Sequence, residues 1–172
     1  MSQPLRAAAV APADLRRAAS RFATGVALVT APGDLALVID SFISASLDPP
    51  LVAFAPSRTS LTWHRMRRTG RFGVSVLDAA HAGSIRERAR PGADRLAGLD
   101  VERLHGVPVL RDALTALVCD LEAEHPAGDH SIVLGRVLAI RDGDLQPPLV
   151  FFDGGFATIE PRQAPAAVMP RR

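Results

Sequence analysis

Apolar, β-branched runs in this chain are short, and turn-forming residues interrupt each of them. Residues 24–30 and 35–39 are two such runs, and residues 31–34 between them include a proline, a glycine and an aspartate. Runs of this length suit buried β-strands and fall far short of the roughly 20 residues that a membrane-spanning helix needs. A tight turn between two such runs is typical of a hairpin. The sequence therefore predicts antiparallel strands and no membrane association.

The same pattern continues along the chain and predicts a mainly β domain with a few short helices. Further strands are expected at residues 51–55, 72–77, 114–124, 131–140 and 148–152. Helices are expected at residues 12–22, 59–69 and 79–89. No glycine-rich G-x-G-x-x-G turn is present, so a closed barrel is favoured over a dinucleotide-binding parallel sheet. We expect one domain over residues 12–160, with flexible Ala/Pro-rich tails at residues 1–11 and 161–172.

Charge gives little indication of a nucleic-acid partner. All 20 basic residues are arginines, 18 acidic residues oppose them, and the formal net charge is only +2. Aromatic residues make up 5% of the chain, too few for the stacking surfaces that bind bases. We interpret the arginines of residues 65–71 and 86–95 as mostly solvated, one or two of them being candidates for contacts with phosphate groups. The single cysteine, Cys119, is expected to be a small buried apolar residue of a cytoplasmic protein.

No common catalytic motif appears. The histidines are too scattered for a metal site: His64, His81, His105, His125 and His130. The sequence also has neither a nucleophile elbow nor a phosphate-binding P-loop. If the chain is an enzyme, its chemistry does not depend on a protein nucleophile.

Polar residues gather in three places. Hydroxyl and apolar residues alternate over residues 40–46, and a glycine turn at residues 128–130 leads through Asp129 to His130. Residues 56–62 form a polar loop at a helix start, where hydroxyl groups, backbone N–H groups and an arginine can hold a phosphate. The same loop also fits an ordinary helix N-cap, and the residues alone leave both interpretations open.

Taken together, several segments resemble the flavin reductase family in order and spacing. They are FATGVALVT (22–30), SFISASLDPPLV (41–52), GRFGVSVL (70–77), GVP (106–108), Cys119, GDH (128–130), GRV (135–137) and PLVFF (148–152). The resemblance extends from about Leu15 to Ile159, and the pairing of S-F-x-S-x-S-L-x-P-P with a later G-D-H is specific to the family.

The resemblance implies an FMN-binding split β-barrel that forms a homodimer. Members of this family use NADH or NADPH to reduce FMN or FAD, and the reduced flavin passes to a separate monooxygenase. The implied flavin contacts are Asp40, Ser41, Ala55, Pro56, Ser57, Ser60 and Thr62. The resemblance places His130 near the nicotinamide, and Phe152 and Gly154 at the far wall of the site.

Two positions depart from the family pattern. Residues 36–38 are Ala-Leu-Val where the family usually has a Gly-Met/Phe-Thr turn, and Asp40 replaces the usual Asn or Ser. A carboxylate repels a flavin phosphate but accepts a hydrogen bond from a ring N–H group. The departures motivate an alternative function, a flavin- or small-ligand-binding barrel without efficient reductase turnover.

Overall fold

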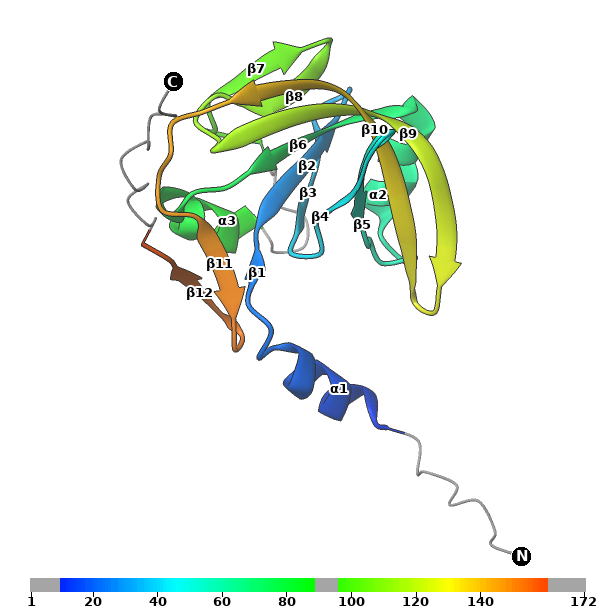
Figure 1. Ribbon diagram of the computed structural model, residues 1–172, viewed down its shortest axis with the longest axis vertical. Coiled ribbons are helices and arrows are strands. Elements are labelled where there is room, and N and C mark those ends of the chain that lie inside the picture. Colours follow the sequence, from blue (N-terminus) through cyan, green and yellow to red (C-terminus); the bar gives the residue numbers. More distant parts are fainter. Residues whose placement is uncertain (1–9, 89–95, 161–172) are drawn as a thin grey trace, which may run out of the picture.

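The computed structural model describes residues 10–88 and 96–160, and most of them lie in antiparallel strands (Figure 1). The strands are β1 (Thr24–Gly25), β2 (Ala27–Ala31), β3 (Leu35–Ile39), β4 (Ile43–Leu47), β5 (Pro50–Phe54), β6 (Arg71–Val76), β7 (Val101–Leu104), β8 (Val107–Leu110), β9 (Thr115–Ala127), β10 (His130–Asp142), β11 (Leu149–Phe152) and β12 (Gly155–Thr158). The helices are α1 (Pro12–Ala19), α2 (Leu61–Met66) and α3 (Ala82–Arg88), with 3-10 turns η1 (Arg67–Thr69) and η2 (Ala79–His81).

One curved sheet forms the body of the molecule. Its seven strands run in the order β3-β2-β6-β9-β10-β5-β4, and every neighbouring pair is antiparallel. The outer strands β3 and β4 are consecutive in the chain, so the sheet must curl to bring its two edges together. It is a barrel left open between β3 and β4, which confirms the expected mainly β split barrel with short helices. Two smaller sheets, β1-β11-β12 and β7-β8, complete the fold.

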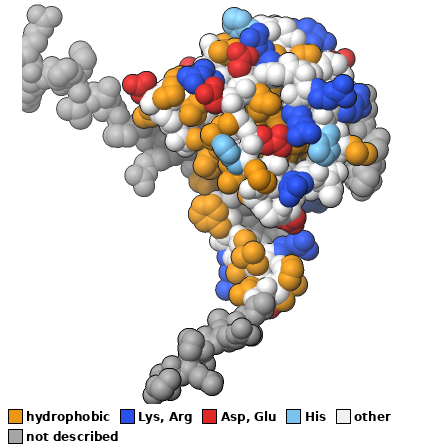
Figure 2. All heavy atoms as spheres, turned by 90° about the vertical axis from the view of Figure 1, so that its right-hand side faces the viewer, with side chains coloured by type: hydrophobic (Ala, Val, Ile, Leu, Met, Phe, Trp, Pro, Cys, Tyr) orange, Lys and Arg blue, Asp and Glu red, His pale blue; other side chains and the backbone are white. Residues whose placement is uncertain are grey.

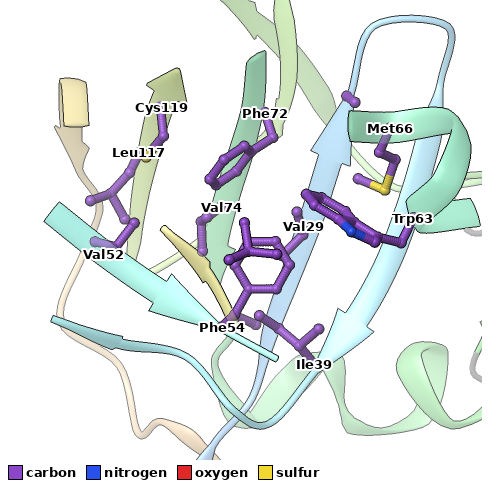
Figure 3. Close-up of a cluster of buried hydrophobic side chains, with 13 residues drawn as sticks. Val29, Ile39, Val52, Phe54, Trp63, Met66, Phe72, Val74, Leu117 and Cys119 are labelled. Atoms are coloured by element: carbon purple, nitrogen blue, oxygen red, sulfur yellow. The ribbon is translucent and has the colours of Figure 1, made fainter. Parts of the chain in front are cut away.

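Strand β2 separates two hydrophobic cores, which explains why all five of its residues are buried. Val29 packs inside the barrel with Phe54, Trp63 and Phe72, whereas Leu28 packs on the opposite face. Figure 3 shows these barrel side chains converging from strands and from α2. A strand buried on both faces is apolar throughout rather than alternating.

The ring of Phe54 is central to the barrel core. Its centroid lies 5.2 Å from that of Trp63 and 5.4 Å from that of Phe72, both in edge-to-face geometry. Such aromatic pairs contribute about 0.5–1.5 kcal/mol each beyond the area they bury. This packing fixes α2 against the strand that precedes it, and so fixes the loop that joins them.

The structure differs from the sequence-based expectations in several strands. Residues 24–30 are divided at Val26 between β1 and β2, which belong to different sheets. No strand was expected at the residues of β4, β7, β8 and β12. Strand β4 lies at the sheet edge with exposed side chains, so its sequence lacks the buried apolar run typical of an inner strand.

The helices correspond to the expectations, except that the first, expected over residues 12–22, is α1 and ends at Ala19. The expected helix over residues 59–69 is α2 followed by η1, and Gly70 ends it with a φ of 70°. The expected helix over residues 79–89 is η2 followed by α3, with residue 89 outside the described part. Of the expected tails at residues 1–11 and 161–172, residues 1–9 and 161–172 also lie outside it. None of the described helices has the length and apolar character required to cross a bilayer.

Candidate functional site

The long β9–β10 hairpin carries His130 at its tip. Residues Ala127 and His130 pair across a two-residue turn in which Gly128 has a φ of 65°, a conformation that favours glycine. The Nδ1 atom of His130 lies 2.8 Å from a carboxylate oxygen of Asp129. The hydrogen bond and charge of His130 lower the pKa of Asp129. Asp129 therefore stays ionised and orients an imidazole that remains exposed to solvent.

The loop that follows β5 lies against this turn. The Ser131 N–H donates to the Pro56 carbonyl oxygen at 3.0 Å, and Ser57 forms an isolated antiparallel bridge with His130. The Ala55 N–H in turn donates to Ser41 Oγ at 3.0 Å. Backbone pairing and the Ser41 side chain thus bring together five of the expected site residues, from three distant parts of the sequence: Ser41, Ala55, Pro56, Ser57 and His130.

Ser60 has a structural role. Its side chain is the N-cap of α2 and accepts a hydrogen bond from the Trp63 N–H at 3.2 Å. Thr62 is partly buried in the first turn of the same helix. These contacts confirm the N-cap interpretation of this loop. They do not bear on the second interpretation, in which the loop binds a phosphate.

Asp40 and Ser41 line a pocket of about 370 Å³ between α1 and the barrel. Its other lining residues are Arg16, Ala19, Ser20, Phe22, Thr24 and Phe151. Asp40 and Phe151 also line a second pocket of about 390 Å³, which reaches Val26 and Phe156. Because the two pockets share Asp40 and Phe151, they adjoin each other, and together they are called the trough; its walls are partly aromatic. An aromatic, mostly apolar trough with a few polar groups fits the ring system of a flavin.

Phe152 and Gly154 belong to the β11–β12 hairpin. Asp153 and Gly154 both have positive φ values, 46° and 78°, as a two-residue hairpin turn requires. The Asp153 N–H donates to the Ser20 carbonyl oxygen at 2.8 Å, so this turn holds the end of α1. Among the described residues, no hydrogen bond or strand pairing joins Phe152 or Gly154 to His130. Their neighbour Phe151, rather than either of them, lines the trough beside Asp40.

A separate hollow of about 380 Å³ lies between α2 and the β9–β10 hairpin. Glu124 is the acidic residue in its lining. It accepts hydrogen bonds from Trp63 Nε1 at 3.2 Å and from Arg67 Nη1 at 3.3 Å. Burial raises the pKa of Glu124, but hydrogen bonds from Ser131, Trp63 and Arg67 outweigh it and lower that pKa below its usual value. The carboxylate therefore stays ionised, and the charge of Arg67 already offsets it.

Most of the arginines on this side of the molecule are exposed and mixed with acids. Arg71 pairs with Asp120 at 2.7 Å, and Arg136 pairs with Glu122 at 2.8 Å. Figure 2 shows basic, acidic and histidine side chains interspersed on this face, with hydrophobic side chains along the arm below. Arg90 and Arg95, also interpreted as solvated, lie outside the described residues.

Sequence reasoning missed part of the trough. Arg16, Phe22, Thr24 and Phe151 all contact it, yet none was assigned a role. Phe22 and Thr24 lie within the FATGV segment that carries the resemblance, so that segment was the available signal. Nothing in the sequence placed Arg16 there, since its position depends on how α1 is held against the barrel.

Several known proteins similar to this chain are reductases. It is 35% identical over 159 residues to the reductase subunit HsaB of a flavin-dependent monooxygenase from Rhodococcus jostii, covering 90% of this chain and 82% of that protein. It is 37% identical over 166 residues to an NADH-dependent flavin reductase from a Rhodococcus species, covering 88% of each.

A solved structure extends the similarity to the fold. The NADH:FAD oxidoreductase SgcE6 of Streptomyces globisporus C-1027, in complex with NAD and FAD fragments, matches with a TM-score of 0.80 and 31% identity. The match covers 94% of this chain and 99% of that one. Residues 19–160 also match the family described as the flavin reductase like domain. With the split barrel, the trough and the His130 turn already in place, these matches show that the chain belongs to the flavin reductase family.

Proposed function

We propose that this protein is an NAD(P)H:flavin oxidoreductase that reduces FMN or FAD. The observation that carries the proposal is the hydrogen-bonded group of Ser41, Ala55, Pro56, Ser57 and His130, placed beside an aromatic trough. The functions of the three similar proteins support it, because all are reductases and two are named for NADH. A bound flavin supplies the redox chemistry, accepting hydride from the reduced nicotinamide.

The chain's own residues bind and orient the reactants. The trough walls, Phe22 and Phe151, exclude water from one face of a planar ligand, and Ser41 and Asp40 offer it hydrogen-bonding groups. The loop of Ala55, Pro56 and Ser57, with Ser60 and Thr62 beyond it, borders the flavin in this proposal, and Phe152 and Gly154 close its far side. His130, oriented by Asp129, donates a hydrogen bond that helps to place the nicotinamide. Direct hydride transfer requires no protein nucleophile.

A spectrophotometric assay tests the proposal. Purified protein is expected to oxidise NADH or NADPH only when FMN or FAD is added, across the four pairings of nucleotide and flavin. No oxidation in any pairing would contradict it. Tight flavin binding without oxidation would instead favour the alternative of a flavin-binding barrel, in which Asp40 and the Ala-Leu-Val residues at 36–38 have removed turnover.

The proposal includes a separate monooxygenase in the cytoplasm that consumes the reduced flavin. The similarity to a reductase subunit of a flavin-dependent monooxygenase supports this partner. Adding the purified protein to a flavin-dependent monooxygenase of the same organism, with NADH and flavin, is expected to produce hydroxylated product. Chemically reduced flavin should replace the protein in that reaction, since only the flavin passes between the two.

We also propose a homodimer. Ile43 is in register with Ala53 and Ala53 with Leu134, so these side chains share the outer face of the sheet. Ile43 is 59% exposed, and Ile132, two residues before Leu134 and therefore on the same face, is 45% exposed. Apolar side chains grouped on one face are typical of an interface. Light scattering should give about twice the chain mass of 18.2 kDa, and a single-chain mass at micromolar concentration would contradict the dimer.

A further inference from the structure

Helix α1 presents one of its arginines to the trough. No residue of α1 is buried, and Figure 1 shows the helix projecting from the barrel end at which both the β9–β10 and β11–β12 turns lie. The bond from the Asp153 N–H to the Ser20 carbonyl oxygen holds the end of the helix. As a result Arg16 and Ala19, on the inner side of α1, line the same pocket as Asp40 and Ser41.

The two adjacent arginines of α1 differ in their contacts. Arg17 forms an ion pair with Asp14 at 2.8 Å, on the helix itself. The guanidinium of Arg16 forms no hydrogen bond or ion pair with any residue in the ranges 10–88 and 96–160. Its positive charge nevertheless reaches Asp129, where it adds to the effect of His130 in lowering the pKa of that carboxyl group. Arg16 is thus a cation with spare donors, directed to the side of the molecule that carries His130.

The surroundings of Arg16 indicate the class of ligand. Ala19, Phe22 and Phe151 provide apolar walls, and Asp40 contributes a negative charge to the same pocket. An anionic ligand that enters this pocket needs a cation to offset the repulsion from Asp40. A guanidinium offers several donors in a planar fork that matches the oxygens of a phosphate.

We propose that Arg16 binds a phosphate group of a nucleotide in the trough. The proposal rests on the proposed function, because FMN, FAD, NADH and NADPH all join a planar ring system to phosphate. The phosphate belongs either to the flavin or to the nicotinamide nucleotide, and riboflavin separates the two, since it has the ring of FMN without the phosphate.

The test compares Arg16→Gln with Arg17→Gln, a matched control on the same helix whose arginine already has a partner. The first arm measures the Kd of FMN and of riboflavin by fluorescence titration, which needs no turnover. If Arg16 holds the flavin phosphate, Arg16→Gln should weaken FMN binding about fivefold or more and leave riboflavin binding unchanged. Arg16→Lys should restore part of the loss, and Arg17→Gln should bind both flavins as the wild type does.

The second arm measures the KM for NADH with saturating riboflavin as acceptor. If Arg16 holds the nicotinamide nucleotide, its KM for NADH should rise about fivefold or more in Arg16→Gln while kcat changes little. Unchanged FMN affinity together with unchanged KM would overturn the proposal, as would equal losses for FMN and riboflavin with an unchanged KM. If either of these results is obtained while the wild-type protein reduces flavin normally, the phosphate role of Arg16 is excluded and the reductase function stands. A wild-type protein that binds neither nucleotide would remove both proposals.

Discussion

Ser57 and His130 face each other across an isolated antiparallel bridge that ties the loop after β5 to the tip of the β9–β10 hairpin. Two backbone hydrogen bonds reinforce the bridge. On one side the Ser131 N–H donates to the Pro56 carbonyl oxygen, and on the other the Arg58 N–H donates to the Asp129 carbonyl oxygen. Two segments more than 70 residues apart in the sequence therefore hold each other at a fixed distance. Any ligand that contacts the loop also lies near the His130 ring.

Replacing His130 with alanine is expected to impair the use of reduced nicotinamide. The substitution removes a ring donor that Asp129 orients, so kcat/KM for NADH should fall about tenfold or more, equivalent to roughly 1.4 kcal/mol. Flavin affinity and melting temperature should change much less. His125→Ala, on the same hairpin, serves as control. A lower melting temperature with unchanged kinetics would show that His130 only supports the turn.

Loss of the α2 cap is expected to cost stability. In Ser60→Ala the Trp63 N–H loses the side-chain oxygen that accepts its hydrogen bond, and the free energy of unfolding should fall by about 1 kcal/mol. Urea denaturation measures the change. Ser60→Asn, which keeps an acceptor suited to an N-cap, should recover most of it. Equal stability of the alanine and asparagine variants would contradict the capping role.

Gly135 is expected to tolerate no side chain. A Cβ there would overlap the Phe72 ring and come within 3.1 Å of Cys119 Cβ, in the barrel core. Gly135→Ala should therefore lower the free energy of unfolding by about 1–3 kcal/mol, as overpacking does. Gly83→Ala provides a contrast, because a Cβ at Gly83 meets no atom within 4 Å and alanine favours the helix. A stable Gly135→Ala protein would mean that Phe72 can move aside.

Glu124 is expected to make stability depend on acid pH. Its pKa is lower in the folded protein than in the unfolded chain, so its ionised form stabilises the fold above the unfolded pKa of about 4.3. That contribution is lost as the pH falls through the folded pKa. The free energy of unfolding of the wild type should exceed that of Glu124→Gln by about 1 kcal/mol at pH 7, and the difference should disappear as the pH falls through the folded pKa of Glu124. Fluorescence of Trp63, the single tryptophan, reports unfolding, and a gap that persists in acid would contradict the role.

Cys119 is expected to resist thiol reagents in the folded protein. Burial, with a smaller effect of the Asp120 carboxylate, raises the pKa of its thiol to about 12. The group therefore stays protonated at neutral pH, whereas the thiolate is the reactive form. An aromatic disulfide reagent should label it only after denaturant is added. Rapid labelling of native protein at pH 7 would show that the barrel opens readily.

The inner strands were predictable from the sequence because burial imposes an apolar run on them. Strand β3 has the expected bounds at Leu35–Ile39, and β11 differs from its expected range only at its start. Strand β4 could not be found in this way, since its hydroxyl residues face solvent at an edge and it contains a register shift between Ser44 and Ser46. Strand β7 carries Glu102 and Arg103, which interrupt its apolar pattern.

The site was partly predictable for a similar reason. The residues of the resemblance included Ser41, the Ala55–Ser57 loop and His130, which hydrogen bonds and a β-bridge bring together. The roles of Ser60 as a cap and of Arg16 as a trough residue depend on tertiary contacts that no local pattern encodes. Placing them required the position of α1 and the packing of α2 against the barrel.

Strand β1 begins at residue 24, yet its described partner is β11, which begins at residue 149. Non-local pairing of this kind imposes an order on folding during synthesis, because a nascent chain must expose everything from β1 to β11 before the small sheet can close. The trough lies beside this late junction, through Thr24 and Phe151. The newly made protein thus acquires its ligand-binding surface only after Phe152 has left the ribosome, later than the barrel strands that lie between β1 and β11 in the sequence.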